Sequence, residues 1–353
     1  MAKQKLAIIL GGVSTEHDVS VVSGTSVIQN LEKDRYDIYP IYISQEGKWY
    51  RYTKPVEQIQ VVPIGTKLEE LEAIDNVMEY LQTMDIAFPV LHGLGGEDGS
   101  IQGLFTLLHL PYVGCGILAS SVGMDKVYTK AILEKAKIRQ TKHVYIQVKE
   151  DGYDWVEEDL SRKKESLETI LTKIEETISY PMFIKPSNSG SSVGVKKASN
   201  KEELRKAIEF AAQFDQKVLV EQGIIGREIE CAVLGTKDVI ASHVGEILSA
   251  EEFYSFDAKY TNAESKTIIP AKIAPAIQEE IQELAKKAFQ AIDGSGLARV
   301  DFFVEDKTNM VYLNEINTMP GFTTVSMYPK LMEEMGISYP DLLNRLIALA
   351  KTK

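Results

Sequence analysis

Residues 183–198, FIKPSNSGSSVGVKKA, read as two short strands that flank a loop rich in serine and glycine. Such a loop is typical of a phosphate-binding segment, because successive backbone N–H groups can point at an anion. Only three residues separate Gly190 from Gly194 and no Lys-Ser or Lys-Thr pair follows, so the loop is not a P-loop. It is not G-x-G-x-x-G either, and the next segment looks like a strand rather than a helix. If this loop binds phosphate, the chain belongs to a fold that holds phosphate with a loop between two strands.

The overall composition limits the number of units and the kinds of partner. A chain of 353 residues exceeds the size that one core usually serves, so we expect two or three packed units. The net charge of −12 argues against a nucleic-acid partner or an acidic membrane surface. The two cysteines, Cys115 and Cys231, are expected to be buried thiols in a reducing compartment. The chain enters a strand directly and contains no apolar run of membrane-spanning length, so the sequence predicts a cytoplasmic protein.

The order of strands and helices predicts an α/β unit followed by α+β units. Residues 1–125 alternate strand and helix, which is typical of an open, largely parallel sheet. Catalytic groups of such sheets lie in loops beyond the carboxyl ends of strands, here GGVSTEHD (11–18) and LHGLGGEDGS (91–100). Alternation is less regular in 126–215 and 216–353, where we expect two α+β units without a linker. The predicted helices cover residues 16–33, 100–110, 126–137, 160–178, 200–214, 276–292 and 338–353.

Residues 296–319 are expected to form two paired strands with a polar face. Arg299 and Asp301 are two apart on the first strand, and Glu315 and Asn317 are two apart on the second, so each pair faces one side. Antiparallel pairing allows both pairs to face one cleft. Oxygen donors without His or Cys favour Mg²⁺ over zinc. On spacing alone, a solvated face with an ordinary salt bridge explains the pattern equally well.

Charged residues near the serine- and glycine-rich loop suggest nucleotide contacts. Lys185 ends the strand before the loop, so its ammonium can reach a phosphate while N–H groups of residues 189–194 line the other side. Read alone, the loop is equally explained as a flexible surface turn. Glu221 and Glu228, in VEQGIIGRE, are suited to accept hydrogen bonds from an adenine amino group and ribose hydroxyls. Spacing alone favours two exposed glutamates.

Loops of the first unit and one long irregular segment offer further contacts. Glu16 projects from the first turn of a predicted helix, where it suits an ammonium group or simply favours the helix dipole. His92 is either a hydrogen-bonding loop residue or a substrate contact. Residues 253–270, FYSFDAKYTNAESKTIIP, have neither strand nor helix periodicity. A long loop with aromatic residues and Lys259 is typical of a lid.

In combination these segments resemble the D-alanine–D-alanine ligase family of ATP-grasp enzymes. The resemblance covers nearly the whole chain and rests on GGVSTEHDVSVVSG, LHGLGGEDGSIQG, PYVGCGILASSVGMDK, FIKPSNSGSSVGV, DAKY, ARVDFF and NEINTMPGFT. It implies an ATP-grasp fold with an N-terminal open parallel α/β domain (1–125). Two α+β subdomains (126–215 and 216–353) then hold ATP between them, and the hairpin loop closes on its phosphates.

The resemblance also implies a reaction and a role for individual residues. In the family, one D-alanine carboxylate attacks the γ-phosphate of ATP to give an acyl phosphate and ADP, and the amine of a second D-alanine displaces phosphate. Glu16, Ser191 and Tyr260 would form a hydrogen-bonded triad, while Arg299 and the Gly321 N–H stabilise the oxyanion. The implied nucleotide-binding residues are Lys126, Lys185, Ser192, Glu221, Glu228 and Lys259. The implied substrate-binding residues are His92, Ser326 and Met327, and the implied ligands of two Mg²⁺ ions, with Mn²⁺ as a substitute, are Asp301, Glu315 and Asn317.

Two departures from the commonest family pattern bear on the lid and the second substrate. Ser255 stands where Asp is frequent, and Val325 stands where His is frequent. Relatives that use D-lactate typically lack the lid tyrosine, so Tyr260 disfavours lactate, whereas D-serine stays an alternative. A non-catalytic nucleotide-binding relative is a further alternative, against which the intact phosphate and metal residues argue. A dehydrogenase is excluded because GGVSTE lacks the dinucleotide fingerprint. The family further implies a homodimer.

Overall fold

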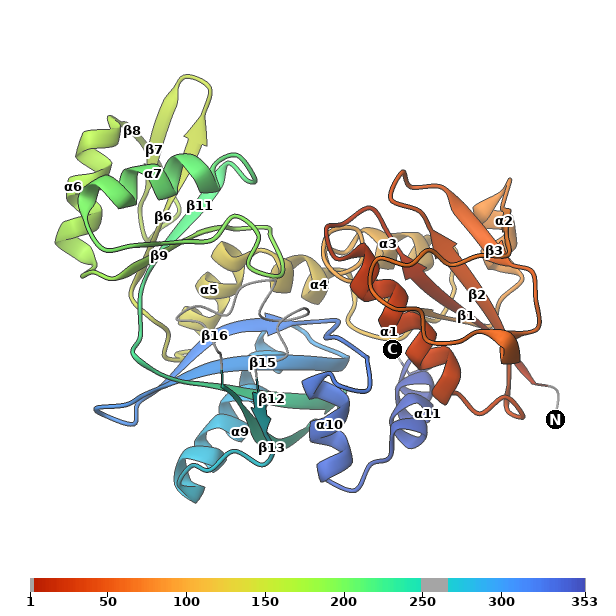
Figure 1. Cartoon of the computed structure of the whole chain (residues 1–353). Coiled ribbons are helices and arrows are strands. Elements are labelled where there is room, and N and C mark those ends of the chain that lie inside the picture. The colour runs from red at the N-terminus through yellow and green to blue at the C-terminus, as the bar shows by residue number, and fades with distance from the viewer. Residues whose placement is uncertain (1–2, 249–265, 353) are drawn as a thin grey trace.

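The computed structural model describes residues 3–248 and 266–352, which form three sheets covered by helices (Figure 1). The first sheet has the order β4-β3-β2-β1-β5 and contains β1 (Gln4–Gly11), β2 (Tyr36–Ile43), β3 (Trp49–Tyr52), β4 (Leu71–Ala73) and β5 (Ile86–Pro89). Strand β1 runs parallel to β2 and β5, and β3 pairs antiparallel with β2. Its helical segments are α1 (His17–Asn30), η1 (Val56–Gln58), α2 (Val77–Gln82) and α3 (Ser100–Leu107). The predicted parallel centre of the sheet is confirmed, and β3 and β4 extend it as an antiparallel edge.

The position of β1 explains its sequence. Residues 6–10, LAIIL, are completely buried, as expected for a central parallel strand that is covered on both faces. Because β1 and β5 are neighbours and run in the same direction, the loops that follow them meet at one edge of the sheet. These are the two loops in which the sequence predicted catalytic groups.

The second sheet has the order β10-β9-β11-β6-β7-β8, and each of its pairings is antiparallel. It contains β6 (His143–Lys149), β7 (Gly152–Val156), β8 (Arg162–Glu165), β9 (Met182–Pro186), β10 (Lys196–Ala198) and β11 (Lys217–Gln222), with helices α6 (Leu167–Thr177) and α7 (Lys201–Ala211). Lys196 pairs with Ile184 across the serine- and glycine-rich loop, so the predicted hairpin is confirmed.

The predicted helix over 160–178 is wrong in its first part. Residues 162–165 form the edge strand β8, which pairs with β7, and α6 begins only at Leu167. Ser166 caps the helix by accepting a hydrogen bond from the Thr169 N–H at 3.1 Å. The charged run RKKE suits a helix and an exposed sheet edge equally, so its composition gave no sign of the change at Ser166.

The third sheet has the order β14-β13-β12-β15-β16. It contains β12 (Gly226–Gly235), β13 (Ile240–Leu248), β14 (Lys266–Ile268), β15 (Gly296–Glu305) and β16 (Val311–Asn317). Helices α4 (Ile117–Met124), α5 (Lys126–Lys135), α9 (Pro275–Ala291) and α10 (Met327–Glu334) lie against it. Leu133 of α5 and Phe289 of α9 share the buried cluster of β15 and β16. The sequence did not predict α4.

Helix α11 (Tyr339–Leu349) returns to the first sheet (Figure 1). Its Leu342 and Leu346 belong to the same buried cluster as Ile8 of β1, and the Tyr36 hydroxyl donates to Asn344 Oδ1 at 2.9 Å. Residues late in the chain therefore complete the core of the first unit, and the domain boundaries near 125 and 215 stay predictions. Within the described ranges, no helix has both the length and the apolar character that crossing a bilayer requires.

Candidate active site

One cavity of about 380 Å³ collects residues from all three units. Every residue for which the sequence implied a role, and which lies in the described ranges, lines it: Glu16, His92, Lys126, Lys185, Ser191, Ser192, Glu221, Glu228, Arg299, Asp301, Glu315, Asn317, Gly321, Ser326 and Met327. Lys259 and Tyr260, as well as Ser255, lie outside the described residues, so their roles stay predictions. The sequence thus identified residues that the fold brings to one place.

The serine- and glycine-rich loop (residues 187–194), called the phosphate loop below after its proposed role, contacts the first unit across this cavity. The Ser191 hydroxyl donates a hydrogen bond to Glu16 Oε1, which joins two of the three members of the predicted triad. A Cβ atom at Gly190 would overlap the same carboxylate, so a larger residue here would displace Glu16 from its present position. Ser191 and Ser192 have φ angles of 48° and 61°. Two successive non-glycine residues in this sparsely populated region are typical of a functional loop.

His92 joins the loop after β5 to the segment after β16. Its Nδ1 lies 3.0 Å from the carbonyl oxygen of Met319, and its Nε2 lies 3.0 Å from Ser23 Oγ. Since a carbonyl can only accept, the proton is assigned to Nδ1, and Nε2 accepts from the Ser23 hydroxyl. Burial lowers the pKa of His92, which favours the neutral ring. Both ring nitrogens contact protein atoms, so His92 is a hydrogen-bonding loop residue, the first of the two alternatives that the sequence left open. Direct contact with substrate stays a prediction.

Glu97 holds the other side of the same Met319 backbone, and the sequence analysis missed it. Its Oε2 accepts from the Met319 N–H at 3.1 Å, and its Oε1 accepts from the Gly93 N–H at 2.9 Å. Burial, reinforced by the nearby Glu16 carboxylate, raises the pKa of Glu97 to about 8. The only available signal was its place in LHGLGGEDGS, a loop after a parallel strand.

Glu221 is buried between two lysines, so the expectation of an exposed glutamate is wrong. Its Oε1 lies 2.6 Å from Lys130 Nζ, and its Oε2 lies 2.7 Å from Lys185 Nζ. The Thr141 hydroxyl also donates to Oε1, at 3.0 Å. Burial opposes the charge of Glu221, but the two ammonium groups outweigh it and hold the pKa of Glu221 far below its ordinary value. Burial likewise opposes the charge of Lys185, and Glu221 raises its pKa.

Lys185 and Glu221 of this cluster line the cavity, and the ammonium of Lys185 suits a phosphate. Lys130 was missed, although it lies four residues after Lys126 on one helix and therefore on the same face. Lys126 donates to the carbonyl oxygen of Ser189 in the phosphate loop at 2.5 Å. Glu228 is half-buried on β12, where it lines the same cavity.

The predicted polar hairpin is confirmed. Arg299 pairs with Asn317 and Asp301 pairs with Glu315, so all four side chains share one face. Arg299 donates from Nε and Nη2 to the two oxygens of Asp301 at 2.8 and 2.7 Å, and Asn317 Nδ2 donates to Asp301 at 2.9 Å. Burial opposes the charge of Arg299, but Asp301 and Glu230 raise its pKa above the ordinary value. The alternative interpretation of these residues as a solvated surface face is wrong, because they line the cavity.

The donor chemistry of this hairpin fits a partial Mg²⁺ site. Asp301, Glu315 and Asn317 offer carboxylate and amide oxygens, the ligands that Mg²⁺ prefers. In the described part of the chain, no three acidic, His or Cys side chains gather into a complete cation site. Mg²⁺ is commonly held by one or two carboxylates together with phosphate oxygens of a bound nucleotide, so an incomplete protein site is what such a complex needs.

The start of α10 lies at the edge of the cavity. Ser326 is the residue before the helix, and its Oγ accepts from the Thr323 N–H at 3.0 Å. A Cβ atom at Gly321 would lie 2.9 Å from Ser326 Oγ, so glycine makes room for the hydroxyl. The N–H groups of the first turn, including that of Met327, suit a carboxylate.

These features define the class of protein. Two antiparallel sheets with a lysine cluster, an oxygen-rich hairpin and a serine- and glycine-rich loop around one cavity form an ATP-grasp ligase. Family models described as D-ala D-ala ligase N-terminus and D-ala D-ala ligase C-terminus match residues 5–115 and 143–348. The chain therefore belongs to the D-alanine–D-alanine ligase family, and the predicted fold and enzyme class are confirmed.

Individual relatives are similar to this chain along nearly its whole length. Proteins described as D-alanine–D-alanine ligases from Acetivibrio thermocellus and Clostridium novyi are 48% and 46% identical, with 99% of this chain and 96% and 98% of theirs covered. The crystal structure of VanG D-Ala:D-Ser ligase from Enterococcus faecalis is 35% identical with a TM-score of 0.84, covering 99% of this chain and 100% of that one. The D-alanine–D-alanine ligase from Coxiella burnetii is 32% identical with a TM-score of 0.81, covering 99% and 94%.

Proposed function

We propose that this protein joins two molecules of D-alanine into D-alanyl-D-alanine, a precursor of peptidoglycan, and cleaves ATP to ADP and phosphate. The observation that carries the proposal is the single cavity at which the Ser191–Glu16 contact, the lysine cluster and the Arg299 hairpin meet. Family membership and the similarity of relatives along the whole chain support it.

ATP would lie between the second and third sheets. Lys126 and Lys185 would contact its phosphates, while the backbone N–H groups around Ser192 line the other side. Glu221 and Glu228 would accept hydrogen bonds from the adenine amino group and the ribose hydroxyls. Lys259, outside the described residues, would add a contact from the predicted lid.

The two D-alanines would lie on the side of the first sheet. Glu16 would bind the ammonium of the first, with His92 nearby. A carboxylate oxygen of this molecule attacks the γ-phosphorus, the bond to the β-phosphate oxygen breaks, and ADP leaves. The carboxylate of the second D-alanine would rest on Ser326 and the Met327 N–H. Its deprotonated amine then attacks the acyl carbon, and inorganic phosphate leaves.

Negative charge builds up at two points of this reaction. Arg299 and the Gly321 N–H would stabilise the oxyanion that forms at the acyl carbon. Asp301, Glu315 and Asn317 would hold two Mg²⁺ ions, with Mn²⁺ as a substitute. When bound, these ions neutralise the charge that gathers on the transferring phosphoryl group. The neighbouring hydrogen bonds from Arg299 and Asn317 fix the Asp301 carboxylate before a nucleotide arrives.

A second candidate product is D-alanyl-D-serine. The similarity to the D-Ala:D-Ser ligase from Enterococcus faecalis favours it, because the two chains share their fold along the whole length. Val325, which is 70% exposed, lines the cavity near the proposed second-substrate position. Its apolar side chain offers no hydrogen bond to the hydroxyl of D-serine, so this residue does not itself favour the second candidate. We further propose a cytoplasmic homodimer that has no nucleic-acid or membrane partner.

Incubation with Mg-ATP and single substrates tests these proposals. The protein receives D-alanine, D-serine, D-lactate or L-alanine, and D-alanine mixed with each of the others. ADP release and the mass of the product are measured. We expect ADP and D-alanyl-D-alanine from D-alanine alone. A mixed product that predominates with D-serine would transfer the assignment to the second candidate, and absence of ADP release from every mixture would refute both.

A further inference from the structure

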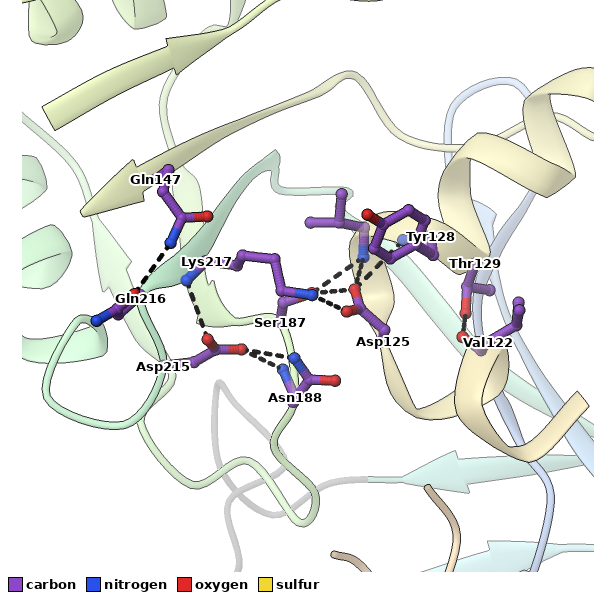
Figure 2. Close-up of polar contacts among 11 residues, drawn as sticks. Val122, Asp125, Tyr128, Thr129, Gln147, Ser187, Asn188, Asp215, Gln216 and Lys217 are labelled. Atoms are coloured by element: carbon purple, nitrogen blue, oxygen red, sulfur yellow. Dashed lines mark hydrogen bonds and ion pairs between the residues drawn. The ribbon is translucent and has the colours of Figure 1, made fainter. Parts of the chain in front are cut away.

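The base of the phosphate loop is fastened to the helix that carries Lys126 (Figure 2). Asp125 precedes α5 and caps it, since its Oδ1 accepts from the N–H groups of Val127 at 3.1 Å and of Tyr128 at 3.3 Å. These hydrogen bonds to the first turn are all that an N-cap residue has to provide. The carboxylate of Asp125 also leaves its own helix, because the same oxygen accepts the Ser187 hydroxyl at 2.5 Å.

Lys217 supplies the third part of this contact, which we call the loop clasp (Asp125, Ser187 and Lys217). Its ammonium pairs with Asp125 Oδ2 and lies 5.0 Å from the centre of the Tyr128 ring. Figure 2 shows the side chain of Lys217 directed at Asp125, while its backbone N–H donates to Asp215 Oδ1 at 3.0 Å. Strand β11 is thereby joined to the start of α5.

Ser187 is the first residue after β9, and each of its polar groups is engaged. It is completely buried, its N–H donates to the Lys217 carbonyl at 2.9 Å, and its carbonyl accepts from the Lys126 N–H at 3.1 Å. A serine at the start of an exposed turn would not need this set of partners. Its hydroxyl therefore determines where the loop leaves the sheet.

The next two residues of the loop are held in the same way. Asn188 donates from its backbone N–H and its Nδ2 to Asp215 Oδ2, at 2.9 and 2.8 Å. The carbonyl oxygen of Ser189 accepts from Lys126 Nζ. The beginning of the loop and the lysine proposed to bind phosphate are therefore positioned by one connected set of contacts.

We propose that Asp125 and Ser187 are positioning residues that hold the phosphate loop and Lys126 in one arrangement for nucleotide binding. This inference rests on the proposed function, since it takes residues 187–194 to be the loop that closes on ATP. None of the three clasp residues lines the cavity. Its loss should loosen the loop before nucleotide binds and weaken nucleotide binding, with the D-alanine side of the cavity unchanged.

Two variants and one matched control test the clasp. Ser187→Ala removes one hydroxyl, and with it the hydrogen bond that this hydroxyl accepts from the Val127 N–H at 3.2 Å, but it leaves the Asp125 cap on α5. Asp125→Asn also keeps the cap, because Asn is as good an N-cap as Asp, but it removes the charge that faces Lys217. Asn200→Ala removes the cap of α7, which accepts from the Glu203 N–H at 3.0 Å and does not line the cavity. Amide exchange of residues 188–195 is measured without nucleotide, together with the Kd for Mg-ADP, and the KM values for ATP and D-alanine.

For Ser187→Ala we expect faster exchange of the loop and about tenfold weaker binding of Mg-ADP, the factor that corresponds to about 1.4 kcal/mol. The KM for ATP should rise with it, while the KM for D-alanine stays within about twofold. Asp125→Asn should change the same quantities in the same direction, and Asn200→Ala should change none of them. The clasp is refuted if Ser187→Ala behaves like Asn200→Ala. If the parent protein releases no ADP with D-alanine, the proposed function fails, and loop exchange still decides the clasp.

Discussion

The buried cluster of Lys130, Glu221 and Lys185 allows us to predict how a substitution at Glu221 changes the free energy of unfolding. Glu221 is 4% exposed, and its carboxylate lies between two ammonium groups, 2.6 Å from Lys130 Nζ and 2.7 Å from Lys185 Nζ. Glu221→Gln keeps the shape of the side chain but leaves two positive charges facing each other in the interior. Removing one partner of a buried ion pair typically costs about 3–5 kcal/mol, and we expect a loss of unfolding free energy in this range.

The effect of Lys130→Met should then depend on Glu221. In the parent protein this change breaks one charge-assisted hydrogen bond and should destabilise by about 1.5–3 kcal/mol. In the Glu221→Gln background it removes one of two repelling charges, so it should stabilise. The effect of Lys130→Met on the unfolding free energy should thus change sign between the two backgrounds. Sites that do not interact give effects that add within about 0.5 kcal/mol, so a change of sign would show that Lys130 and Glu221 interact.

Urea denaturation of the four proteins in this cycle measures the free energies of unfolding. Glu72→Gln is the matched control, because Glu72 pairs with Arg51 at 2.8 Å but is 56% exposed, and such surface pairs contribute about 0–1 kcal/mol. Equal destabilisation by Lys130→Met in both backgrounds would refute the idea that Glu221 neutralises two lysines at once. So would a Glu221→Gln protein as stable as Glu72→Gln.

Three further predictions concern the cavity. Because burial raises the pKa of Glu97 to about 8, the folded protein binds a proton there between about pH 4.5 and 8 that the unfolded chain does not. The unfolding free energy of the parent relative to Glu97→Gln should therefore fall as pH rises through this window, and a difference independent of pH would contradict the assignment. Glu315→Gln should lower turnover far more than it lowers stability, because it removes a charge from the proposed Mg²⁺ site; equal loss of activity and of folded protein would make Glu315 structural. Saturating Mg-ATP should slow amide exchange of residues 187–194, and unchanged exchange would mean that these residues form only a turn.

The sequence predicted best where a local pattern is also the functional pattern. Arg299, Asp301, Glu315 and Asn317 alternate with apolar residues, so period-two spacing alone places them on one face of a hairpin. The serine- and glycine-rich loop carries its own turn signals. These segments appear in the structure as predicted.

Prediction failed where long-range contacts decide the outcome. Glu221 looks exposed in VEQGIIGRE, since its partners Lys130 and Lys185 come from a helix and a strand far away in the sequence. The start of α6 depends on whether RKKE joins an edge strand, which local propensity does not settle. Nothing near residues 339–349 indicates that this helix packs against β1.

The position of α11 has a consequence for the nascent chain. Tyr36 and Asn344, which contact each other in the finished protein, are 308 residues apart. At about 5–20 residues per second, a ribosome needs roughly 15–60 s to travel from one to the other. Throughout that time the apolar surface that α11 later covers has no partner from its own chain. The first unit to be translated is therefore among the last to be completed, and its emerging sheet is a natural substrate for a chaperone.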